Sequence, residues 1–98
     1  MGQGAIDAFR MAAHPNPAAQ KFGVWLTAEL EKRGWGKRTL ARKLAGPGAS
    51  LTKIDHTRRN VTEYAAGRVN PSSEARRNIA KALLVPLRDL PPADEEGD

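Results

Sequence analysis

Four clusters of glycine and proline divide the chain into short segments, and this division sets the strongest limit on its fold. The clusters are "HPNP" at 14–17, "GWG" at 34–36, "GPG" at 46–48 and "GRVNP" at 67–71. Proline breaks a helix from within, and glycine is favoured at the position just past a helix end. Between the clusters, apolar residues recur with a helical period and do not alternate as strands require. We therefore expect an all-α protein, a small bundle of about five helices.

The 98 residues are expected to form one small domain, whose modest core suits short packed helices. Residues 17–90 should make up this folded domain. Residues 1–16 would form either a short helix, with Ile6, Phe9 and Ala13 on one face, or a flexible arm. The segment "PPADEEGD" at 91–98 has four acids and no apolar period, so we expect a disordered acidic tail.

Start and stop signals place the main helices. Asn16 resembles an N-cap, and Gly34 suits a left-handed helix end. A second helix is expected over 37–44, and a later one begins at the cap Ser72, after which Pro86 opens a last short turn. The residues expected to face the core are Phe22, Trp25, Leu26, Leu30, Leu40, Ala41, Leu44, Ala75, Ile79, Ala82 and Leu83.

A basic helix follows the "GPG" cluster, and it has two alternative starts within "ASLTKIDHTRRN" at 49–60. A start at Thr57 would present Arg58 and Arg59 alike in the first turn. A start near Thr52 would place both arginines in the middle of the helix, with Arg59 outward and Arg58 at the flank.

The helical period favours the earlier start. With Val61 taken as the inward direction, the apolar stripe continues upstream of Thr57. Thr52 and Asp55 also resemble a capping box. We therefore expect a helix over about 51–66. Its inward half should hold Leu51, Ile54, Thr57, Arg58, Tyr64 and Ala65, and its outward half Thr52, Asp55, His56, Arg59, Asn60 and Glu63.

The positive charge is concentrated in this region. The chain has a formal charge of +5, and seven of its sixteen basic residues lie between Lys37 and Arg59, where Asp55 is the single acid. Such a block indicates an anionic partner, most plausibly nucleic acid, although a solvated basic surface explains the charge equally well.

Several other classes of protein are not indicated. The chain has no cysteine, and its two histidines, His14 and His56, lie in different segments, so we expect no metal or cofactor. The segment "AGPGAS" lacks the lysine and the spacing of a phosphate-binding loop, and no catalytic triad is indicated. We expect no enzyme and no small-molecule ligand. No apolar run approaches the roughly 20 residues of a membrane helix, and no signal-peptide pattern is present, so a cytoplasmic location is expected.

Three stretches, "RGWGKRTLARKL" at 33–44, "VTEYAAGRVNP" at 61–71 and "ARRNIAKALLVPLRDL" at 75–90, together resemble the lambda-repressor-like family of Xre or Cro-type helix-turn-helix proteins. Three features depart from the family pattern. Gly36 stands where serine or threonine usually caps a helix, Ala65 stands where glutamate is frequent, and the connection from Leu44 to the basic helix is extended. The resemblance implies that the basic helix enters the major groove of DNA.

On this resemblance, side chains of the basic helix would read base edges and neighbouring groups would contact phosphates. Arg59 suits a guanine, Asn60 an adenine and Glu63 a cytosine amino group. Arg58 would reach a phosphate from the flank, or a base if the helix starts at Thr57. The expected base readers are His56, Arg58, Arg59, Asn60 and Glu63. The expected backbone contacts are Lys37, Arg38, Arg42, Lys53, Thr57, Arg68 and Asn70.

The function expected from these features is sequence-specific binding of double-stranded DNA by a bacterial or phage regulator, a repressor or Cro-like factor associated with the nucleoid. A weak homodimer through the last helix or the segment around Ile6 and Phe9 is compatible with this. The alternative is a small protein-binding adaptor on the same scaffold.

Overall fold

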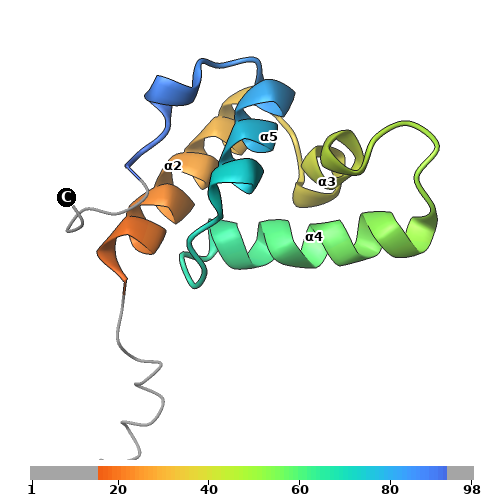
Figure 1. Ribbon diagram of the computed structural model, residues 1–98, viewed down its shortest axis with the longest axis horizontal. Coiled ribbons are helices and arrows are strands. Elements are labelled where there is room, and N and C mark those ends of the chain that lie inside the picture. The colour runs from red at the N-terminus through yellow and green to blue at the C-terminus, as the bar shows by residue number, and fades with distance from the viewer. Residues whose placement is uncertain (1–15, 93–98) are drawn as a thin grey trace, which may run out of the picture.

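The computed structural model describes residues 16–92, which form four α-helices and one short 3-10 helix, with no strand in this range (Figure 1). The expected all-helical bundle is confirmed for this part of the chain. The short helix or flexible arm expected within residues 1–16 and most of the acidic tail lie outside the described residues, apart from Asn16 at the start of the described range. The elements are α2 (Pro17–Arg33), α3 (Lys37–Ala45), α4 (Leu51–Ala65), α5 (Ser73–Leu83) and η1 (Leu87–Asp89).

The helix ends follow the local signals in the sequence. The Oδ1 atom of Asn16 accepts hydrogen bonds from the backbone N–H groups of Ala18 at 2.9 Å and Ala19 at 3.2 Å, so Asn16 caps α2. Ser72 caps α5 in the same manner. Gly34 ends α2 with a φ of 69°, a left-handed conformation that glycine adopts without strain. The predictions for these three residues are confirmed.

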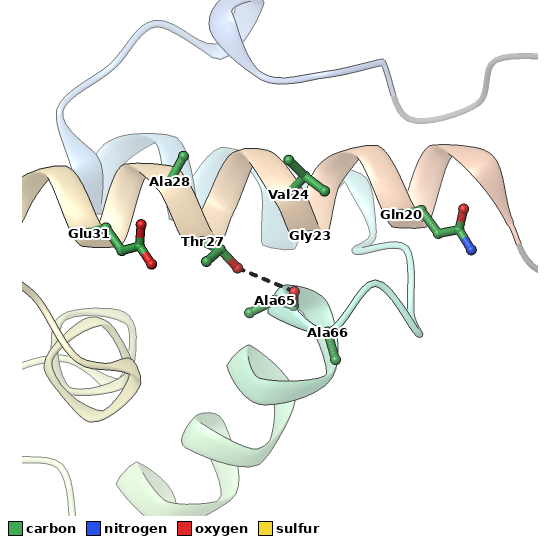
Figure 2. A pocket seen from close by; sticks show the side chains of 8 residues that line it. All are labelled: Gln20, Gly23, Val24, Thr27, Ala28, Glu31, Ala65 and Ala66. Carbon is green, nitrogen blue, oxygen red and sulfur yellow. Dashed lines mark hydrogen bonds between the residues drawn. The ribbon is translucent and has the colours of Figure 1, made fainter.

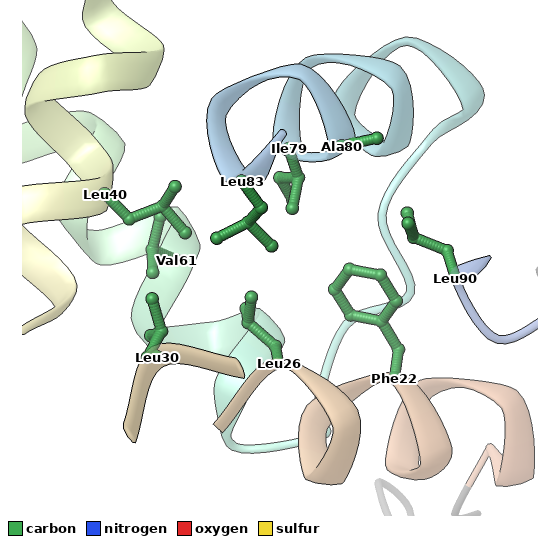
Figure 3. Packing of buried hydrophobic residues seen from close by; sticks show 9 residues of the cluster. All are labelled: Phe22, Leu26, Leu30, Leu40, Val61, Ile79, Ala80, Leu83 and Leu90. Atoms are coloured by element: carbon green, nitrogen blue, oxygen red, sulfur yellow. The ribbon is translucent and has the colours of Figure 1, made fainter. Parts of the chain in front are cut away.

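The core lies where α2, α5 and the inner faces of α3 and α4 converge (Figure 3). Phe22 and Leu26 of α2 are fully buried, and Trp25, Leu44 and Tyr64 pack against the cluster while partly exposed. On α5 the prediction was partly wrong. Ile79 and Leu83 are buried and Ala82 packs against the cluster while partly exposed, but Ala75 is half-buried outside it, and Ala80 and Arg76 lie inside. The cluster of nine buried residues is Phe22, Leu26, Leu30, Leu40, Val61, Ile79, Ala80, Leu83 and Leu90.

The helix α4 begins at Leu51, which decides between the two starts in favour of the long helix. Ser50 is the N-cap, and its hydroxyl accepts a hydrogen bond from the backbone N–H of Lys53 at 3.1 Å. The expected capping box of Thr52 and Asp55 is therefore wrong, because Ser50 already fills the capping position. Leu51 is also not inward, since its side chain is 70% exposed. The inward stripe of α4 begins instead at the buried Ile54.

Replacing Ser50 with alanine should destabilise the protein by about 1 kcal/mol, because the first turn of α4 loses its capping acceptor. Thermal or urea unfolding measures this loss. Ser50→Gly is the matched control and should cost only a few tenths of a kcal/mol, because glycine is nearly as good at a cap. An equally small effect of both variants would contradict a helix start at Leu51.

The C-terminal end of α4 is fixed against α2 by a close approach of their backbones (Figure 2). A Cβ atom at Gly23 would lie 2.8 Å from the carbonyl oxygen of Ala65 and 2.7 Å from the backbone nitrogen of Gly67. The hydroxyl of Thr27 donates to the same Ala65 oxygen at 3.4 Å. This junction holds the C-terminal end of α4 on α2, while α3 packs across the middle of α4. None of the helices in residues 16–92 is long and apolar enough to cross a membrane.

Candidate nucleic-acid interface

The basic residues of α3 lie on its exposed side. Leu40 and Ala41 turn to the core, which leaves the charged residues outside. Gly36 caps this helix without a side-chain hydrogen bond, so the first backbone N–H groups of α3 have no capping side chain. A helix start of this kind, together with nearby cations, favours an anion. The exposed cations of α3 are Lys37, Arg38, Arg42 and Lys43.

The predicted outward half of α4 is exposed at Thr52, His56, Arg59 and Asn60, and half-buried at Asp55 and Glu63. The side chain of Arg59 is 69% exposed. Arg58 lies at the flank, half-buried, and donates to Oδ1 of Asp55 through Nη2 at 3.1 Å and Nε at 3.3 Å. The two neighbouring arginines therefore differ in exposure and in their distance from Asp55, because Nη2 of Arg59 lies 3.9 Å from Oδ2 of that carboxylate.

A polar cleft of about 360 Å³ lies between Arg38 in the first turn of α3 and residues 51–59 of α4. Two arginines, Arg38 and Arg59, line it together with the His56 ring and the carboxylate of Asp55. The hydrogen bond from Arg58 is the main reason that the pKa of Asp55 lies below its usual value, and the charges of Arg58, Arg59 and Arg38 lower it further. Asp55 is therefore ionised at neutral pH.

At the other end of α4, two of the expected DNA contacts are partners of each other. Arg68 donates to the two carboxylate oxygens of Glu63 at 2.9 and 3.3 Å. This hydrogen bond lowers the pKa of Glu63 and raises that of Arg68. Glu63 was expected to read a base and Arg68 to contact a phosphate, so each would have to exchange or share its present partner to do so.

The remaining expected backbone contacts are more scattered. Lys53 is exposed, whereas Thr57 is half-buried and its hydroxyl donates to the carbonyl oxygen of Lys53 at 2.8 Å. Asn70 is half-buried in the loop between α4 and α5. These positions put Lys53 on the same helix as the expected base readers, and Asn70 beyond its far end.

Asp55 is the residue that the prediction of site residues missed. Its spacing was a usable signal, because acids three and four residues before an arginine are neighbours of that arginine on a helix surface. Leu51 and Thr52 also line the cleft and were not expected to do so.

Arg76 is buried away from this face and is not part of the site. Its guanidinium lies 5.5 Å from the centre of the Phe22 ring and donates to the carbonyl oxygen of Pro91, which ties the segment after η1 to the core. Burial lowers the pKa of this guanidinium.

Residues 16–92 contain no group of three or more histidine, cysteine, aspartate or glutamate side chains placed to hold a metal ion. Comparisons with family models, with curated proteins and with solved structures found no match to this chain.

Proposed function

We propose that this chain is a sequence-specific regulator that binds double-stranded DNA, with α3 and α4 as a helix-turn-helix of the lambda-repressor-like kind. The observation that carries the proposal is the exposed row His56, Arg59 and Asn60 on α4, beside the cationic, uncapped start of α3. Side chains of these types donate and accept at base edges, and a helix start with nearby cations suits a phosphate. On this proposal α4 lies in the major groove and α3 meets the DNA backbone.

The long α4 sharpens this arrangement. Its N-terminal turns lie beside α3 at the end of the molecule farthest from η1 (Figure 1). Arg38 of α3 and Arg59 of α4 line the same cleft, so a phosphate contact and a base contact would sit next to each other. A protein held on an operator in this way would act as a repressor by blocking access of polymerase.

The direct test is selection of bound duplexes from a random pool. Enrichment of one short sequence would support sequence-specific binding, and a palindromic site would indicate a homodimer. Retention of no duplex at low salt would exclude the proposal and favour a protein-binding adaptor. Equal retention of all duplexes would support DNA binding but contradict sequence-specific recognition.

Replacing Arg59 with alanine should reduce the preference at one base position by about 1–3 kcal/mol, because a bidentate contact to guanine is lost. Lys37→Ala is the matched control, since it removes one positive charge from the same face. It should weaken binding to all sequences alike. Fluorescence anisotropy on the selected duplex and on its single-position variants measures both effects. A uniform loss in Arg59→Ala would show that Arg59 contacts only the backbone.

A further inference from the structure

Asp55 occupies an unusual place for an acid. It is the only acid from Lys37 to Arg59, and its side chain is 43% exposed in the cleft between α3 and α4. Its two carboxylate oxygens face different arginines. Oδ1 accepts from Arg58 at 3.1 Å, whereas Oδ2 lies 3.9 Å from Nη2 of Arg59.

The separation of 3.9 Å is too long for a hydrogen bond, so Oδ2 of Asp55 and Nη2 of Arg59 both keep capacity for another partner. Arg58 meanwhile holds the carboxylate in place through Oδ1. The result is an oriented acceptor beside an exposed donor, one helical turn apart on the outward face of α4.

Stability alone gives a weak reason for this acid. Exposed ion pairs of this kind contribute little to folding. A carboxylate on a face that meets phosphates also weakens DNA binding in general, because like charges repel. An acid in this position is therefore better explained by what it recognises or rejects.

We propose that Asp55 and Arg59 together read one G·C base pair in the major groove. Arg59 would donate to O6 and N7 of the guanine, and Oδ2 of Asp55 would accept from the N4 amino group of the cytosine. Guanine O6 and cytosine N4 are hydrogen-bonded to each other in the base pair, so two side chains as close as these can reach both. This inference rests on the proposed function and assigns Asp55 a part in specificity.

The same carboxylate would reject an A·T pair in that orientation. Thymine presents its O4 acceptor where cytosine presents an amino donor, and two acceptors repel. Arg59 would then face the adenine amino group, which is also a donor. Discrimination therefore comes from repulsion as well as from attraction.

The test compares the wild-type chain with Asp55→Asn on the selected duplex and on the same duplex carrying A·T at the G·C position. The wild-type chain should prefer the G·C duplex by about 5- to 100-fold, and the variant should lose at least about 5-fold of that preference. Its affinity for a random duplex should stay equal or rise, because one negative charge is removed. Asp89→Asn makes the same chemical change on exposed η1 and should leave the preference unchanged.

A second measurement changes the DNA in place of the protein and compares the wild-type chain with Asp55→Asn. N4-methylcytosine at the same position replaces the amino hydrogen that faces the major groove, so it should weaken wild-type binding by about 5-fold or more. It should have little effect on Asp55→Asn. The inference would be overturned if Asp55→Asn bound every duplex more tightly but kept the wild-type preference. It would also be overturned if N4-methylcytosine did not weaken binding of the wild-type chain. Either result would leave the proposal of DNA binding intact. Failure of the wild-type chain to bind any duplex would overturn the proposed function as well.

Discussion

Truncating Phe22 to alanine should cost about 3–5 kcal/mol of folding free energy. The ring is fully buried at the centre of the core. Its neighbours include Trp25, with ring centres 5.5 Å apart, and Tyr64 in an edge-to-face contact at 6.4 Å. The truncation removes both aromatic contacts and leaves a cavity below the buried guanidinium of Arg76.

The effect is large compared with the stability of the whole domain. A domain of this size is stable by roughly 4–12 kcal/mol, so the loss is at least about a quarter of the total, and at the low end of that range it would unfold the variant. Urea unfolding followed by circular dichroism measures the loss. Phe22→Leu is the matched control, because it keeps most of the buried volume and should cost clearly less. Equal stability of Phe22→Ala and the wild-type chain would contradict the packing of α2 in the core.

Replacing Gly23 with alanine should destabilise the protein by about 2–3 kcal/mol, although alanine is the better helix former by about 1 kcal/mol. The added Cβ would lie within 2.9 Å of three backbone atoms, which belong to Ala65 and Gly67. Backbone atoms cannot rotate away as a flexible side chain does, so α2 and the end of α4 must separate. Overpacking therefore outweighs helix propensity at this position.

The matched control is Gly36→Ser, a glycine with nothing within 4 Å of its added Cβ and with a φ of −85° that serine accepts. Serine at this cap should be neutral or stabilise the protein by a few tenths of a kcal/mol. Thermal unfolding of the two variants gives the comparison. A Gly23→Ala variant as stable as the wild-type chain would contradict the close approach of α2 and α4. If the proposed function is right, Gly23→Ala should also weaken DNA binding, because the junction positions α4.

The helix boundaries were predictable because their causes are local. A cap acts on N–H groups two or three residues away, and a left-handed glycine acts at its own position, so Asn16, Gly34 and Ser72 could be identified from the sequence. The apolar stripe of α4 likewise predicted the long helix. The helical period predicted the face of α4 on which Leu51 lies, but it could not show whether another helix packs against that face. Neither α2 nor α5 reaches the first turn of α4, and Leu51 is exposed for that reason.

The candidate site was predictable in its outward residues but not in their pairings. The helical period placed His56, Arg59 and Asn60 on the exposed face of α4, and the structure confirms that all three are exposed. The pairing of Glu63 with Arg68 depends on how the chain turns after α4, which a helical period does not describe. The approach of Gly23 to Gly67 joins residues far apart in the sequence, so it follows only from the tertiary structure.

The most direct test of the central proposal is the salt dependence of binding to duplex DNA. If α3 and α4 contact phosphates through about five cations, the logarithm of the binding constant should fall with the logarithm of salt concentration with a slope of about −4 or steeper. Removing Arg38 or Lys37 should reduce that slope by about 1. Weak binding that does not change with salt, for every duplex in a random pool, would contradict the proposal that this basic face binds DNA.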